Sequence, residues 1–123
     1  MGSILNIQSV NGNQVTVNMN STQDPTNRFF PGWGSIDSDV SRPDRVVGWS
    51  ICWIYPGQPP SDYRSVTSYT GLYYEDSGII SVIFDLVDES GYIKRSYDYF
   101  AKEGNEAALE EFKNSEHYAK FNR

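Results

Sequence analysis

The acidic side chains whose spacing could support catalysis are Asp85 and Asp88, with Asp37 in an earlier loop. Two carboxylates held about 5–9 Å apart across a cleft can hydrolyse a glycosidic bond, one as general acid and the other as base or nucleophile. Asp85, however, lies on the minor face of an expected strand, and Asp88 begins a turn. Edge and turn roles are therefore favoured, and a small hydrolase using these loop carboxylates is only a second alternative function.

Nucleophilic catalysis would depend on His117 and Cys52, which are the only histidine and the only cysteine. A Ser-His-Asp or Cys-His arrangement would need His117, in an expected terminal helix, to reach a nucleophile in the sheet. We expect a solvated histidine and a small buried cysteine instead. One cysteine and one histidine also disfavour zinc. No phosphate-binding loop, dinucleotide fingerprint or nucleophile elbow is present, so no cofactor and no catalytic residue are predicted.

The acidic stretch from Asp37 to Asp44 resembles a calcium-binding loop at first sight. Its sixth position is Arg42 where an EF-hand needs glycine, and its twelfth is Gly48 where an EF-hand needs glutamate. A looser calcium site remains an alternative. Asp and Ser side chains that bind nearby backbone amides are the favoured interpretation, and no metal site is predicted.

Aromatic residues are the remaining candidates for function. The stretch Phe29-Phe30-Pro31-Gly32-Trp33-Gly34 places a tryptophan between glycines, and several tyrosines follow. Rigid amphipathic rings are enriched in binding hot spots, where they contact proteins or stack on sugars. In the alternative interpretation, Trp33 folds back as a core plug beneath its own loop. The predicted partner-binding residues are Phe30, Trp33, Tyr55, Tyr63, Tyr69, Tyr73 and Tyr74.

Strands must position these side chains. Residues 79–100 alternate apolar and polar side chains on either side of a turn that contains Gly91, which predicts a long β-hairpin. A second hairpin is predicted around Asn11-Gly12-Asn13. Residues 46–55 form a further expected strand with a bulky face, and its small face would suit a second covering layer. Residues 63–74 predict one or two strands broken near Gly71.

Two segments depart from strand patterns. Residues 20–44 contain three prolines and two glycines, which predicts a long ordered loop that can include short strand pieces. Asn105 is a suitable N-cap for a helix from Glu106 to about Phe121. The expected organisation is a β-sandwich over residues 1–104 with a terminal helix over residues 105–123, packed on or appended to the same domain.

Several short strands separated by turns predict an all-β, mainly antiparallel fold, an immunoglobulin-like β-sandwich of about six to eight strands with a short C-terminal α-helix. The strand from Trp49 to Tyr55 and the strand containing Tyr97 resemble strands C and F of immunoglobulin-like and fibronectin-like domains. The disulfide that joins the sheets of antibody domains is absent, since Cys52 is alone. The resemblance is one of fold pattern and implies no activity.

Charge and length limit the partners. The chain has 123 residues, enough for one domain, and a formal net charge of −6, which disfavours direct binding to nucleic acid but not to a basic protein surface. No polybasic run, signal peptide or membrane-spanning window is found, so no membrane insertion is predicted. We expect a cytoplasmic or particle-associated protein, or a piece cut from an exported one.

The function expected from these features is non-enzymatic binding of another protein, or self-association. A structural or surface assembly subunit and a small acidic inhibitor of a larger protein both fit, with edge strands, the aromatic loop and the terminal helix as contacts. The alternative is a carbohydrate-binding module that stacks glycans on Trp and Tyr side chains.

Overall fold

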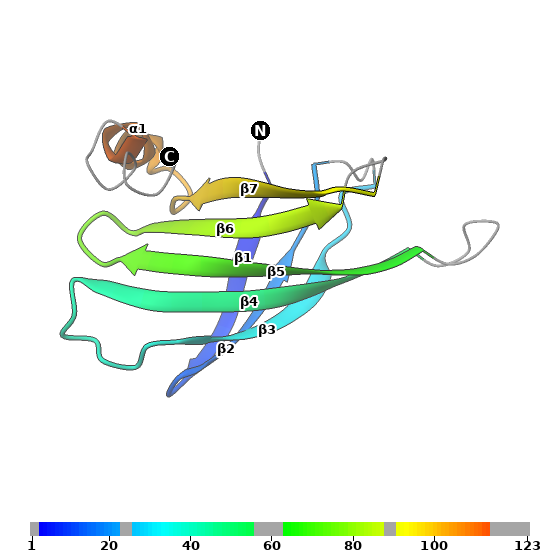
Figure 1. Ribbon diagram of the computed structural model, residues 1–123. Helices are drawn as coiled ribbons and strands as arrows, with labels where there is room; N and C mark the ends of the chain where they lie inside the picture. The colour runs from blue at the N-terminus through cyan, green and yellow to red at the C-terminus, as the bar shows by residue number, and fades with distance from the viewer. Residues whose placement is uncertain (1–2, 23–25, 56–62, 88–90, 114–123) are drawn as a thin grey trace.

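The computed structural model describes residues 3–22, 26–55, 63–87 and 91–113 (Figure 1). Within these ranges seven strands are followed by one helix. In chain order they are β1 (Leu5–Asn11), β2 (Gln14–Met19), β3 (Phe30–Ile36), β4 (Asp44–Tyr55), β5 (Tyr63–Tyr74), β6 (Ile79–Val87), β7 (Ile93–Phe100) and α1 (Glu106–Lys113).

All the described strands lie in one sheet, and each pairs antiparallel with the strand that follows it along the chain. The predicted all-β, antiparallel class with a short C-terminal helix is therefore confirmed. The two-sheet, immunoglobulin-like sandwich is not confirmed, because the described residues form no second sheet.

Both predicted hairpins are present. β1 and β2 meet at a turn in which Gly12 has a φ of 64°, and β6 pairs with β7 from Val87 opposite Ile93 to Ile80 opposite Phe100. Such positive φ angles are costly for residues with a Cβ, which explains glycine at this turn. Gly91, the turn glycine before β7, also has a positive φ of 85°.

One expectation from glycine and proline was incomplete and another was wrong. The predicted loop over residues 20–44 contains β3, a strand in the middle of the sheet that pairs with β2 and β4. Pro31 is tolerated there because β3 pairs with β4 only from Gly32 onward. The predicted break near Gly71 does not occur, since β5 continues from Tyr63 to Tyr74. A Cβ at Gly71 would lie 2.7 Å from Val82 Cα, so glycine serves close strand approach there.

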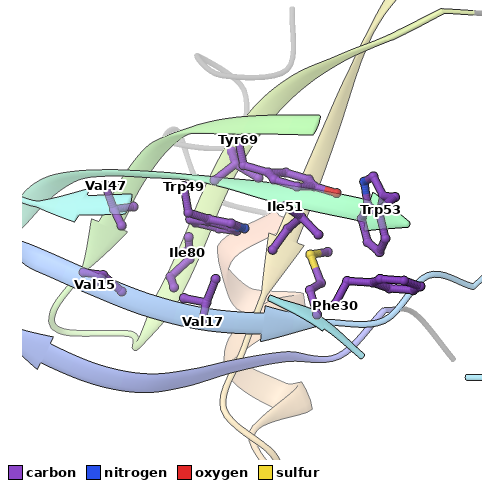
Figure 2. Packing of buried hydrophobic residues seen from close by; sticks show 11 residues of the cluster. Val15, Val17, Phe30, Val47, Trp49, Ile51, Trp53, Tyr69 and Ile80 are labelled. Carbon is purple, nitrogen blue, oxygen red and sulfur yellow. The ribbon is translucent and has the colours of Figure 1, made fainter. Parts of the chain in front are cut away.

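The core lies on one face of the sheet, which we call the inner face. The sheet twists so strongly that β1 to β3 cross behind β4 to β7 (Figure 1). Figure 2 shows Val15 and Val17 of β2 facing Trp49 and Ile80 across the core. The two halves of one sheet thus bury each other, as two separate sheets would in a sandwich. The buried core residues also include Met19, Phe30, Val47, Ile51, Trp53, Tyr69 and Val82.

Glycines in β3 permit this folding. A Cβ at Gly32 would collide with the Ile51 side chain and lie 2.9 Å from Val17 Cγ2, so β2 and β4 meet over a position that must lack a side chain. A Cβ at Gly34 would lie 2.7 Å from the Cα of Trp49. Both glycines therefore let the inner face close on itself.

The opposite face, which we call the outer face, is covered at one end. α1 contacts β6, and Ile79 and Ser81 on the outer side of β6 are fully buried, which we attribute to α1 and the segment leading into it. The predicted helix start at Glu106 is confirmed. Its predicted continuation from residue 114 to Phe121 lies outside the described residues.

Candidate interaction site

Trp33 lies on the outer face of β3, with 58% of its surface exposed. Side chains alternate between the two faces of a strand, so Trp33 points away from the core, toward which Gly32 and Gly34 are directed. Core packing leaves no room for a side chain at these two glycines. Trp33 is therefore not a core plug. Phe30, three residues earlier, fills that role, because it is 6% exposed and packs edge-on against Trp53 with ring centroids 5.4 Å apart.

Hydroxyl side chains flank Trp33 across the sheet. Thr16 of β2 and Ser50 of β4 are its direct strand neighbours. Ser50 Oγ lies 2.8 Å from Ser68 Oγ of β5, and Thr16 Oγ1 lies 2.6 Å from Ser9 Oγ of β1. A row of hydroxyls thus crosses the outer face with one large aromatic ring in its middle. Such a surface can make both apolar contacts and hydrogen bonds.

A cleft of about 450 Å³ opens next to this row, over β5 and β6 and as far as Arg95 of β7. Val66 is 64% exposed at its edge. Phe84 belongs to the inner face, so its place in the wall indicates that the cleft reaches the level of the strand backbones. The lining residues are Val66, Ser68, Thr70, Ile83, Phe84, Asp85 and Arg95.

Asp85 and Arg95 form an ion pair at this cleft. Arg95 Nε donates to Asp85 Oδ1 at 3.0 Å, across the β6–β7 ladder. This hydrogen bond, more than the charge of the guanidinium, lowers the pKa of the Asp85 carboxyl. A carboxyl held ionised in this way is poorly suited to act as a general acid. Asp88, its predicted partner in hydrolysis, lies outside the described residues.

The other predicted aromatic residues do not gather around Trp33. Tyr69 is buried on the inner face and stacks on Trp49 at a centroid distance of 5.2 Å. Tyr73 is half-buried beneath the Arg45 guanidinium, which lies 5.4 Å from the ring centroid. Tyr74 is half-buried at the other end of β5. Tyr55 pairs with Tyr63 through the backbone, but the side chains of these two lie outside what the structure describes.

The loop from Asp37 to Asp44 shows the turn chemistry that the sequence favoured. Asp39 accepts hydrogen bonds from the Ser41 hydroxyl and the Ser41 amide, and these bonds lower the pKa of its carboxyl. Asp37 accepts from the Asp39 amide at 3.0 Å, and Arg42 lies 3.6 Å from the Asp37 carboxylate. Among the described residues, no group of three or more Asp, Glu, His or Cys side chains could hold a metal ion.

Asp98 is a feature that the sequence reasoning missed. It lies on β7 opposite Val82, which places its carboxyl on the inner face among apolar side chains. Burial raises the pKa of the Asp98 carboxyl, although a 2.9 Å hydrogen bond from the Tyr99 amide opposes this. Burial also raises the pKa of the Tyr69 phenol, and the charge of Asp98 adds to this effect. The signal in the sequence was that Asp98 shares its strand face with Phe100.

The two nucleophile candidates are not brought together by the described residues. Cys52 lies on the outer face of β4 and is half-buried rather than buried as expected. His117 lies outside the described residues. In the part of the chain that the structure covers, no helix has the length and apolar character that crossing a bilayer requires.

No protein-family model matches the chain, and no curated protein or solved structure is detectably similar to it.

Proposed function

We propose that the chain is a non-enzymatic protein-contact module that docks onto a partner through the outer face around Trp33. The observation that supports this most directly is the 58% exposure of a tryptophan on a central strand. Tryptophan is the residue type most enriched in binding hot spots, and an exposed one in the middle of a sheet face offers a rigid anchor.

The surroundings of Trp33 suit a protein partner. Val66 and Val46, also on the outer face, are 64% and 61% exposed, and hydroxyls of Ser50 and Ser68 lie between the apolar groups. Apolar groups around an aromatic ring can form the core of a protein interface, and the hydroxyls can supply hydrogen bonds to the partner. The net charge of −6 favours a partner with a basic surface. A structural or surface assembly subunit and a small acidic inhibitor both remain compatible with such a contact.

The experiment is a quantitative pull-down from extracts of the source cells, read by mass spectrometry, with the wild-type chain and two variants as bait. Trp33→Ala should weaken capture of a specific partner by about 2 kcal/mol, or roughly thirtyfold in Kd. Phe29→Ala is the matched control, because Phe29 is 43% exposed but precedes β3. Equal capture by all three baits would refute a role for Trp33.

Self-association is tested separately by light scattering over a concentration series. If the partner is a second copy, the mass should rise with concentration for the wild type and Phe29→Ala but not for Trp33→Ala. A monomer at every concentration, together with no captured protein, would contradict the proposed function.

Carbohydrate binding is a second candidate, favoured by the hydroxyls of Thr16 and Ser50 on both sides of the exposed indole. Sugars stack their apolar faces on aromatic rings while their hydroxyls bind polar neighbours. A glycan array should then give signals that Trp33→Ala removes. An array without signal for the wild type would remove this candidate.

A further inference from the structure

Two hairpin arms of the sheet separate from each other. β4 and β5 pair over their whole length, to Tyr55 opposite Tyr63, and β6 and β7 pair from Val87 opposite Ile93. Between the arms, β5 and β6 pair only as far as Tyr69 opposite Phe84. Beyond this pair β4–β5 and β6–β7 diverge (Figure 1), and the 450 Å³ cleft lies at the point of divergence.

The backbone of β5 exposes hydrogen-bonding groups to this cleft. Glu75 N donates to Pro43 O at 3.0 Å, one position beyond the pair of Tyr74 with Asp44. In an antiparallel ladder the hydrogen-bonded pairs alternate, so odd-numbered residues of β5 bond to β4 and even-numbered residues point toward β6. Val66 therefore directs its N–H and C=O toward the β6–β7 arm. It lies beyond the last β5–β6 pair, Tyr69 with Phe84, so it does not pair with β6.

The side chains around the cleft suit an extended peptide. Val66 and Ile83 offer apolar contacts, whereas Ser68, Asp85 and Arg95 offer hydrogen bonds and charge. An extended chain presents alternate side chains to opposite sides and main-chain groups along both edges. It can therefore hydrogen-bond to the backbone of β5 while its side chains contact the side chains that line the cleft. A small molecule could fill the volume but would leave the backbone edge unpaired.

We propose that an extended segment of another protein adds to the cleft-facing edge of β5 at Val66 as an extra strand. The segment carries alternating apolar residues and a net positive charge, since the chain has a formal net charge of −6. The same charge disfavours a second copy as occupant. This inference rests on the proposed function in so far as both concern protein contacts, but it uses the backbone edge of β5 at Val66 rather than the ring of Trp33, and the two contacts share the side chains of Val66 and Ser68.

The probe is a set of linear peptides enriched on the wild-type chain from a random phage-displayed library and then synthesised. Val66→Pro removes the amide that faces the cleft and leaves the β4–β5 ladder bonds intact, and it should weaken peptide binding by roughly tenfold or more. Val66→Thr, which keeps the amide and a β-branched side chain, is the matched control and should bind within about threefold. Equal binding to both variants, or the absence of any enriched peptide, would overturn the proposal.

Amide hydrogen exchange of the wild type provides a readout that does not depend on a variant. Peptide binding should slow exchange of the Val66 amide at least about tenfold, as expected for a newly paired strand amide. Protection confined to the region around Trp33, or unchanged exchange at Val66, would refute strand addition. Trp33→Ala tests the other surface: loss of peptide binding in Trp33→Ala but not in Val66→Pro would support the outer-face contact and reject the cleft.

Discussion

Replacing Gly34 by alanine tests the packing that folds the sheet over itself. An ideal Cβ at Gly34 would lie 2.7 Å from both Cα and Cβ of Trp49 and would overlap the Gly48 carbonyl oxygen. Carbon atoms in contact prefer about 3.5–4.0 Å, so β3 and β4 would have to separate by about 1 Å. The obstructing atoms include backbone, which cannot rotate away as a side chain would.

The expected cost follows from these distances. Overpacking a core costs about 1–3 kcal/mol, and backbone obstruction places Gly34→Ala near the upper end. The loss of glycine's freedom in the unfolded chain offsets about 0.4–1 kcal/mol of this. The free energy of unfolding should therefore fall by about 2–3 kcal/mol. With a urea m-value of about 1–3 kcal/mol/M, the midpoint falls by roughly 0.7–3 M.

Gly48→Ala is the matched control, since it makes the same chemical change on the strand that pairs with β3. The nearest atoms to its added Cβ would be the Tyr69 carbonyl oxygen, at 3.1 Å, and two Thr70 atoms at 3.9 Å. Its free energy of unfolding should change by less than about 1 kcal/mol. Urea titrations followed by tryptophan fluorescence measure both variants. Equal midpoints for Gly34→Ala and Gly48→Ala would refute the account of β3.

Three further variants test individual interactions. Asp98→Asn should stabilise the fold at neutral pH, because burial raises the pKa of Asp98 and makes its ionised form unfavourable. The gain in unfolding free energy should vanish as the pH falls below the ordinary carboxyl range, where Asp98 is protonated in both the folded and the unfolded chain. A difference in unfolding free energy that does not change with pH would contradict this. Thr67→Val should cost about 1–3 kcal/mol, because Trp53 Nε1 donates to Thr67 Oγ1 at 2.8 Å in the core; an unchanged urea midpoint would contradict it. Arg45→Lys should cost about 1 kcal/mol by losing the stack on Tyr73, and thermal unfolding indistinguishable from wild type would show the stack to be immaterial.

Alternation along the strands was predictable because it depends on local geometry. The bulky face of β4, from Val47 to Trp53, is the buried one as expected. β3 was missed because glycine occupies two of its inner positions. The order Phe30, Gly32, Gly34, Ile36 is still a period-two pattern, but its apolar signal is absent where the core of this fold needs empty space.

The number of sheets could not be predicted from the same patterns. A hairpin with one apolar face buries it equally well against a second sheet or against a distant part of its own sheet. Here the twist carries β1 to β3 behind β4 to β7, so that residues far apart in the sequence, such as Val17 and Ile80, share one core. For the same reason, the sequence left open whether Trp33 is a core plug or an exposed contact residue, because what covers a side chain depends on distant parts of the chain.

The edges of the sheet argue for the cleft as the site of strand addition. Exposed edges invite pairing with other chains, and proteins protect them with bulges and charged side chains. β1 at one outer edge has a register shift between Ile7 and Ser9, and β7 at the other has exposed Lys94 and Arg95. Val66, which lines the cleft and lies beyond the last β5–β6 pair, has neither device. An edge left unprotected within a cleft, while both outer edges are protected, is what selective pairing with an inserted strand requires.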